Sequence, residues 1–125
     1  MTRTSAATAL FAVARVGFGA GLMGAPGRVA AGWIGADAER EPVKIVVRAV
    51  GARDIALSVG LLNSLGERHD STPWLALTVV CDLCDLGATL AAPADCLPPR
   101  ARWGTAAMAG GAALAGVGLL AAVKR

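Results

Sequence analysis

Charged residues are scarce in this chain. They make up 17% of its 125 residues, against about 25% in a typical soluble domain. The sequence is 55% hydrophobic, and 16 glycines come in addition. One domain of this length has no soluble core large enough to hold so many apolar residues. The composition therefore indicates a polytopic membrane protein whose outer surface faces lipid.

Cysteines are also few, and their number argues against a disulfide framework. The chain has three, Cys81, Cys84 and Cys96, and an odd number cannot all pair within one chain. Cys81 and Cys84 form a CxxC in the middle of a predicted helix, whereas reactive CxxC pairs usually lie at a helix N-terminus. We interpret them as small buried side chains. We expect no metal site, because His69 and Cys96 fall in opposite loops, and we expect no cofactor.

Basic residues do not cluster on one face. The formal net charge is +3, and the lysines and arginines lie mostly in short loops, at the termini or inside apolar stretches. A nucleic-acid partner would require a concentrated basic surface. The distribution argues against nucleic acid and favours membrane lipids as the surroundings of the chain.

Four long apolar stretches predict four membrane-spanning helices. They cover residues 5–23, 43–65, 74–92 and 103–123, and a helix needs roughly 20 residues to cross the hydrocarbon. The first stretch lacks a good cleavage site after it, so we interpret it as a span and not as a signal peptide. Between the first two spans, Trp33 and Ile34 predict a short helix at the headgroups. The expected fold is all-α, a four-helix transmembrane bundle formed by residues 1–125 as one multi-pass domain in the cell membrane.

Six charged side chains lie inside these apolar stretches. A charge at bilayer depth costs at least about 2.5–3.5 kcal/mol and usually faces a partner or a watery cavity. Three of the six are positive and three are negative, so their formal charges cancel. They are Arg15, Arg48, Arg53, Asp54, Asp82 and Asp85. The simplest interpretation is one buried Arg/Asp cluster in the middle of the bundle.

Asp82 and Asp85 are the candidate catalytic residues. Their i, i+3 spacing places them on one helix face, about 60° apart. Two close carboxylates repel, so one tends to keep its proton unless arginines neutralise both. That split suits acid–base chemistry, and paired carboxylates also form proton relays or cation sites in membranes. The alternative is that arginines of other spans simply pair with them.

The remaining intramembrane charges are candidate ligand-binding residues. Arg48 and Arg53 differ by about 140° around their helix, so this helix has neighbours on more than one side or lines a cavity. Adjacent residues on a helix do not face each other, so we expect Arg53 to turn to another helix and not to Asp54. We predict that a guanidinium of Arg15, Arg48 or Arg53 lies within about 3 Å of Asp82 or Asp85. Such contacts either form an anion site or lock the bundle.

Small residues provide surfaces for close helix packing. Gly17 and Gly21 form a GxxxG pair, and the last span is rich in glycine and alanine. Such faces usually pack against other helices of the same chain. A seam between copies in a homo-oligomer is the alternative.

One run of residues gives the chain a resemblance to a known protein family. It reads Arg-Ala-Val-Gly-Ala-Arg-Asp-Ile-Ala-Leu-x-x-Gly from Arg48 to Gly60, and Arg15-x-x-x-Gly19 and Trp33-Ile34-Gly35 precede it. With these features the chain resembles small four-helix membrane proteins known only as a domain of unknown function, and more loosely DoxX-like proteins. The resemblance implies a membrane location and four helices, and it implies no activity.

Three functions remain open from the sequence. In the first, the cluster organises the bundle or binds a small polar, lipid-like, apolar or anionic ligand. In the second, Asp82 or Asp85 donates a proton to an apolar substrate such as a prenyl chain, while Arg53 holds an anionic group. In the third, the chain is a proton-coupled carrier and works as an oligomer. A fully paired cluster favours the first, a lipid-open cavity at Asp82 the second, and a water-filled path the third.

Overall fold

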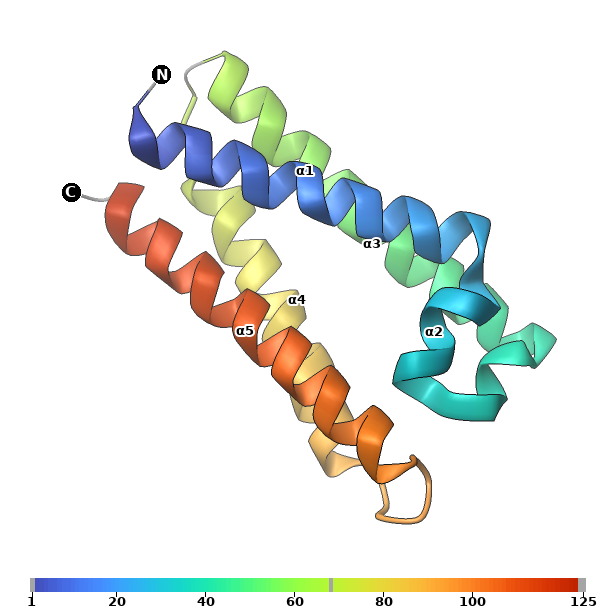
Figure 1. Cartoon of the computed structure of the whole chain (residues 1–125). Helices are drawn as coiled ribbons and strands as arrows, with labels where there is room; N and C mark the ends of the chain where they lie inside the picture. The colour runs from blue at the N-terminus through green and yellow to red at the C-terminus, as the bar shows by residue number, and fades with distance from the viewer. Residues whose placement is uncertain (1, 68, 124–125) are drawn as a thin grey trace.

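The computed structural model describes residues 2–67 and 69–123, and every regular element within them is a helix (Figure 1). The order is α1 (Arg3–Gly24), α2 (Pro26–Ile34), the 3-10 helix η1 (Gly35–Glu39), α3 (Glu41–Gly66), α4 (Thr72–Ala91) and α5 (Pro99–Val123). The four predicted spans correspond to α1, α3, α4 and α5, which begin slightly earlier than predicted. The all-α fold is confirmed.

Proline and glycine set the helix ends. Pro26 and Pro99 open α2 and α5, and Pro73 lies in the first turn of α4. Proline suits this place because its missing N–H would have no intrahelical acceptor there. Gly35 adopts a φ of +78°, which glycine tolerates best, and this turn ends α2.

The α4–α5 connection is held by one arginine. Arg102 donates from Nη2 to the Ala92 carbonyl oxygen at 2.8 Å and from Nη1 to the Leu90 carbonyl oxygen at 3.3 Å. It also donates to the carbonyls of Thr89 and Pro93. The last carbonyls of a helix have no intrahelical donor, so Arg102 caps α4 and holds the start of α5 beside it.

The long helices form two close pairs. In Figure 1, α1 lies along α3, and α4 lies along α5. At the α1–α3 crossing, a Cβ added to Gly19 would lie 2.6 Å from the Gly51 carbonyl oxygen, and one added to Gly51 would lie 2.6 Å from that of Gly19. In the other pair, a Cβ on Gly116 would lie 2.6 Å from a methyl carbon of Val79. Each pair therefore depends on a glycine for its close approach.

The two pairs meet at one end and separate at the other. The first residues of α1 and the last of α5 lie at the same end, and α2 lies at the opposite end, where the pairs diverge (Figure 1). An apolar cluster that contains Ala12, Leu61 and Leu75 fills the converging end. Another, built around Leu22 and Val47, lies beside α2. The charged side chains that are described below as the candidate site lie between these two apolar clusters.

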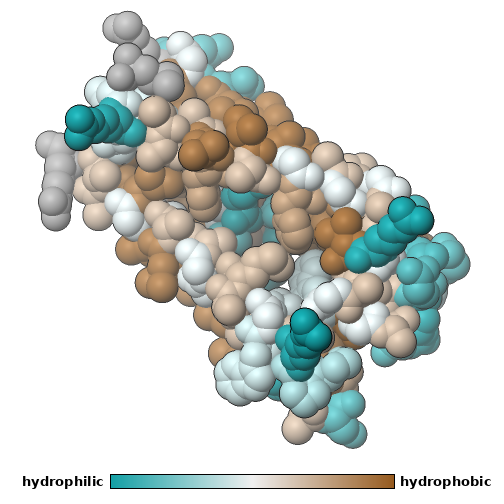
Figure 2. Space-filling model, in the orientation of Figure 1, coloured by the Kyte–Doolittle hydropathy of each residue, from teal (hydrophilic) through white to brown (hydrophobic). Residues whose placement is uncertain are grey.

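The outer surface suits lipid. Leu10 and Leu114 are 72% and 75% exposed, and hydrophobic residues cover the middle of the long helices while hydrophilic ones gather towards the ends (Figure 2). Three described helices, α1, α4 and α5, are long and apolar enough to cross a membrane. The 26-residue α3 is long enough but is not one of these three helices. The described residues therefore have the features of a helical membrane protein with three clear candidate spans.

Candidate functional site

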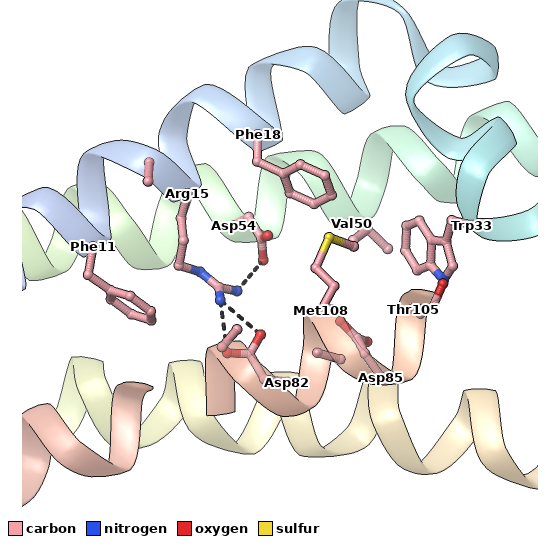
Figure 3. Close-up of a pocket in the computed structure, with 13 residues that line it drawn as sticks. Phe11, Arg15, Phe18, Trp33, Val50, Asp54, Asp82, Asp85, Thr105 and Met108 are labelled. Carbon is pink, nitrogen blue, oxygen red and sulfur yellow. Dashed lines mark hydrogen bonds and ion pairs between the residues drawn. The ribbon is translucent and has the colours of Figure 1, made fainter. Parts of the chain in front are cut away.

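Arg15 lies at the centre of the site. From α1, its Nη1 donates to both carboxylate oxygens of Asp82 on α4, at 2.9 and 2.8 Å, and its Nη2 donates to Asp54 Oδ1 on α3 at 2.9 Å (Figure 3). The side chains are 11%, 6% and 5% exposed for Arg15, Asp82 and Asp54. One buried guanidinium therefore joins three helices.

Arg53 forms the second half of the arrangement. Its Nη2 donates to Asp85 Oδ2 at 2.7 Å and its Nη1 donates to Asp85 Oδ1 at 3.2 Å. Two-point contacts of this kind are strong and geometrically selective. These bonds, with those of Arg15, confirm that arginines of other helices lie about 3 Å from Asp82 and Asp85.

Arg53 turns to another helix, as expected, through its bonds to Asp85 on α4, and it makes one further contact that was not expected. Its Nη2 also donates to Oδ1 of Asp54 at 3.4 Å, although the two residues are neighbours in sequence. The Cβ directions of such neighbours diverge on a helix, but the long arginine side chain places its guanidinium within reach of Asp54. Asp54 therefore accepts from both Arg15 and Arg53 and links the two ion pairs.

Arg48 lies outside the cluster, although the sequence predicted one cluster of six charged residues. It is exposed, and its Nε donates to the carbonyl oxygen of Met23 at the end of α1, 3.3 Å away. With Arg28, Glu39 and Lys44 it lines a separate polar hollow of about 370 Å³ at the start of α2. Its position on α3 turns it away from the α4 aspartates, as the angle of about 140° from Arg53 requires. A ligand-binding role for Arg48 stays a prediction.

We call the remaining five residues the charge cluster. It comprises Arg15, Arg53, Asp54, Asp82 and Asp85. Two guanidiniums face three carboxylates, so the fully ionised charge cluster carries a formal charge of −1. Within residues 2–67 and 69–123, no other basic side chain forms an ion pair with these three aspartates.

An apolar pocket of about 320 Å³ opens beside the charge cluster. Figure 2 shows hydrophilic atoms at the bottom of a hollow between hydrophobic walls, and Figure 3 shows the side chains that surround it. Its apolar lining consists of Phe11, Ala14, Phe18, Trp33, Val50, Met108, Ala109 and Ala112. Its polar lining consists of Arg15, Asp54, Asp82, Asp85 and Thr105. The pocket thus combines an extensive apolar wall with a few charged groups at one side.

Thr105 is the exception among the buried threonines. The hydroxyls of Thr8, Thr78 and Thr89 each donate to the carbonyl oxygen four residues earlier. Thr105 is 3% exposed, lines the pocket from α5, and its Oγ1 has no hydrogen-bond partner. Nε of Arg15 and Nε of Arg53 are the other buried side-chain atoms of the described chain without a partner.

The pocket wall was missed by sequence reasoning, although part of its signal is present. Phe11, Arg15 and Phe18 follow an i, i+4, i+7 spacing, which places them on one helix face. Trp33 was interpreted as a headgroup anchor, but α2 folds back so that its ring lines the pocket. The contribution of α5 has no sequence signal, because Thr105 and Met108 lie in a helix without charges beyond its first turn.

The described residues contain no group of three or more His, Cys, Asp or Glu side chains placed to hold a metal ion. Cys81, Cys84 and Cys96 are free thiols. Both oxygens of Asp82 and both oxygens of Asp85 accept hydrogen bonds from guanidiniums. Both aspartates therefore act as hydrogen-bond acceptors towards arginines in this structure, and the catalytic role stays a prediction.

Comparisons with protein-family models, with curated proteins and with solved structures find no match to the chain.

Proposed function

We propose that this chain is a four-span membrane protein that binds a small, largely apolar ligand in the pocket beside its charge cluster. The observation that carries this proposal is the pocket itself. Its volume of about 320 Å³ falls at the lower end of the range of roughly 300–1,000 Å³ that is usual for ligand sites. Predominantly apolar walls with a few convergent polar groups are typical of such sites.

The central charged side chains of α3 face the protein interior, which supports α3 as the fourth span. Its 26 residues exceed the roughly 20 that a crossing requires. Asp54 is buried and Arg53 is paired with Asp85, so the central charges of α3 face protein and not lipid. Lys44 lies near the start of the helix, where a long side chain can reach the headgroups. The even number of crossings agrees with the common end of α1 and α5.

The pairing within the charge cluster favours binding over chemistry. A fully paired cluster is the arrangement expected of a protein in which these residues organise the bundle and shape a site. The resemblance to small four-helix membrane proteins belongs to the same proposal, and so do the location in the cell membrane and lipids as partners. The pocket at Asp82 is one feature in favour of the acid–base enzyme, but both oxygens of Asp82 accept hydrogen bonds from Arg15, so the enzyme stays a prediction. The proton-coupled carrier and the homo-oligomer stay predictions too.

Ligand binding is tested by filling the pocket. Ala112 lines it, whereas Ala115 lies on the same helix and is exposed. We expect purified protein in detergent micelles to bind 3-phenylpropanol beyond the partition into empty micelles, measured by titration calorimetry. Ala112→Leu should weaken this binding about tenfold through loss of space, and Ala115→Leu should not. Equal binding by the two variants, or no binding above the micelle blank, would contradict the proposed site.

The number of spans is tested by labelling single cysteines from one side of membrane vesicles. With Cys81 and Cys84 changed to serine, a membrane-impermeant maleimide should reach Cys96 from one side. In a background that also lacks Cys96, it should reach Asp37→Cys from that same side. It should reach His69→Cys only from the other, because α3 lies between Asp37 and His69. Labelling of Asp37→Cys and His69→Cys from the same side would show that α3 does not cross.

A further inference from the structure

We infer that the pocket selects a small organic ammonium ion, with its cationic group beside Asp85 and its apolar body against the aromatic wall. This inference rests on the proposed pocket and adds the charge of the ligand. The sequence left open a small polar, lipid-like, apolar or anionic ligand, and the inference specifies a cationic one.

The charge of the cluster is the first argument. Because Arg48 lies outside it, the charge cluster has one carboxylate more than it has guanidiniums. An excess negative charge next to an apolar pocket is unfavourable unless a cation or a proton compensates it. A ligand with a positive group supplies that compensation at the place where the pocket and the charge cluster meet.

Access to the charged groups is the second argument. Among the charged side chains that line the pocket, Asp85 is the most exposed at 26%, while Arg15 is only 11% exposed. The Nη atoms of Arg15 point to Asp54 and Asp82, and its Nε is buried. Arg53, the partner of Asp85, does not line the pocket, so Asp85 is the charged group that a ligand in the pocket reaches most easily.

The aromatic wall is the third argument. Aromatic faces attract cations that lie within about 6 Å of the ring centre, and the pocket has three aromatic residues, Phe11, Phe18 and Trp33. Phe11 already receives the Arg15 guanidinium, whose central carbon lies 5.6 Å from the ring centre. Phe18 and Trp33 have no such partner in the described part of the chain, and Figure 3 shows both beside the pocket.

Thr105 provides a polar group that the protein itself does not use. Its hydroxyl is buried at the pocket and unpaired, unlike those of Thr8, Thr78 and Thr89. A buried polar group without a partner is costly, and such groups usually find one in a ligand or an ordered water. The hydroxyl oxygen can accept a hydrogen bond from an ammonium that also contacts Asp85 across the pocket.

Three probes with one carbon skeleton separate charge from shape. We expect 3-phenylpropylammonium to bind at least about tenfold more tightly than 3-phenylpropanol, the range for a charge-assisted hydrogen bond, and 3-phenylpropanoate to bind most weakly. Titration calorimetry at neutral pH, corrected with empty micelles, measures all three. Equal binding of ammonium and alcohol would mean that a proton neutralises the cluster, and tighter binding of the carboxylate would reverse the assigned charge. Either result overturns the inference and leaves the pocket standing, whereas no binding of any probe would defeat the proposed function.

Two variants locate the preference. Asp85→Asn should reduce the ammonium-to-alcohol preference to near unity, while Asp95→Asn, which changes an exposed loop carboxylate, should leave it unchanged. Since Asp85→Asn also alters the Arg53 pair, Thr105→Val serves as a second variant that removes an unpaired hydroxyl. It should keep the melting temperature and weaken ammonium binding several-fold. Unchanged preference in both variants would place the cation elsewhere and overturn the inference.

Discussion

The contacts inside each helix pair differ in kind from the contacts between the pairs. Inside the α1–α3 pair, Gly19 and Gly51 bring the two backbones together, and Gly116 has the same role against Val79 in the α4–α5 pair. Between the pairs, Arg15 reaches Asp82 and Arg53 reaches Asp85, with a pocket beside them. Close packing leaves no space for a ligand, whereas long side chains hold two surfaces together at a distance and leave a hollow.

The two kinds of contact also differ energetically. Small-residue contacts gain dispersion energy and require no desolvation of charge. A buried ion pair carries a large desolvation cost, and its apolar replacement is often neutral or stabilising, while loss of one partner alone costs about 3–5 kcal/mol. We therefore expect the charge cluster to specify which faces of the helix pairs meet.

Loss of Arg15 should have the largest effect. Arg15→Ala removes the common partner of Asp54 and Asp82 and leaves both carboxylates buried without it. We expect a loss of about 3–5 kcal/mol in the free energy of unfolding. Arg53→Ala should follow closely, because it leaves Asp85 without its two bonds from Arg53.

The matched control is Arg100→Ala, which removes an exposed arginine near the start of α5 and should cost less than about 1 kcal/mol. Thermal unfolding in one detergent compares the three variants. If Arg53→Ala and Arg100→Ala melt at the same temperature, the buried network does not hold the pairs together.

Gly51→Ala should have the next largest effect. The added Cβ would lie 2.6 Å from the Gly19 carbonyl oxygen, so α1 and α3 must move apart, at a cost of about 1–3 kcal/mol. Gly17→Ala is the control, since a Cβ there has nothing within 4 Å, and alanine should stabilise the helix by about 0.4–1 kcal/mol. Melting temperatures that shift in the same direction for both would argue against a glycine-dependent helix crossing.

Arg48→Ala should have a small effect and should mark the boundary of the charge cluster. Arg48 donates a hydrogen bond to the Met23 carbonyl and its side chain is exposed, so we expect a change of less than about 1 kcal/mol in stability. The ratio of ammonium to alcohol affinity in the pocket should stay at its parental value. If Arg48→Ala lowers the free energy of unfolding as much as Arg53→Ala does, Arg48 is part of the buried network.

The double change Cys81→Ser and Cys84→Ser should have the smallest effect. Both thiols are free in the structure, and neither contributes a bond to the charge cluster. The variant should melt close to the parent protein, and the intact mass of the parent should match three reduced thiols. A mass of the parent lower by two hydrogen atoms, restored by reductant and absent from the double variant, would show redox chemistry at the CxxC.

Sequence reasoning predicted the pairing of charges well because few alternatives exist in lipid. Once Arg15, Arg53, Asp82 and Asp85 were placed inside apolar helices, each needed an opposite charge, and other helices supplied it. The helix positions followed in the same way from the apolar stretches and from the prolines at their ends.

What sequence could not predict depends on geometry between helices. The exclusion of Arg48 depends on the rotation of α3 about its axis, and the α1–α3 contact at Gly19 and Gly51 fixes that rotation. The pocket depends on the divergence of the two pairs and on the return of α2, which places Trp33 opposite α5. The hydrophobic pattern of a single helix predicts neither the rotation of α3 nor the angle between the two pairs.

A double-mutant cycle on Arg15 and Asp82 tests most directly that a specific ion pair joins the two helix pairs. Arg15→Met should lower the melting temperature strongly, because it leaves Asp54 and Asp82 buried without their common partner. Asp82→Leu should lower it less, because Arg15 keeps its bond to Asp54. The combined variant should lose less than the sum of the two single losses, with a coupling free energy of about 2–3 kcal/mol, because only Asp54 is then left without Arg15. Additive losses, with the double variant less stable than the parent protein by the full sum of the two single losses, would contradict this account.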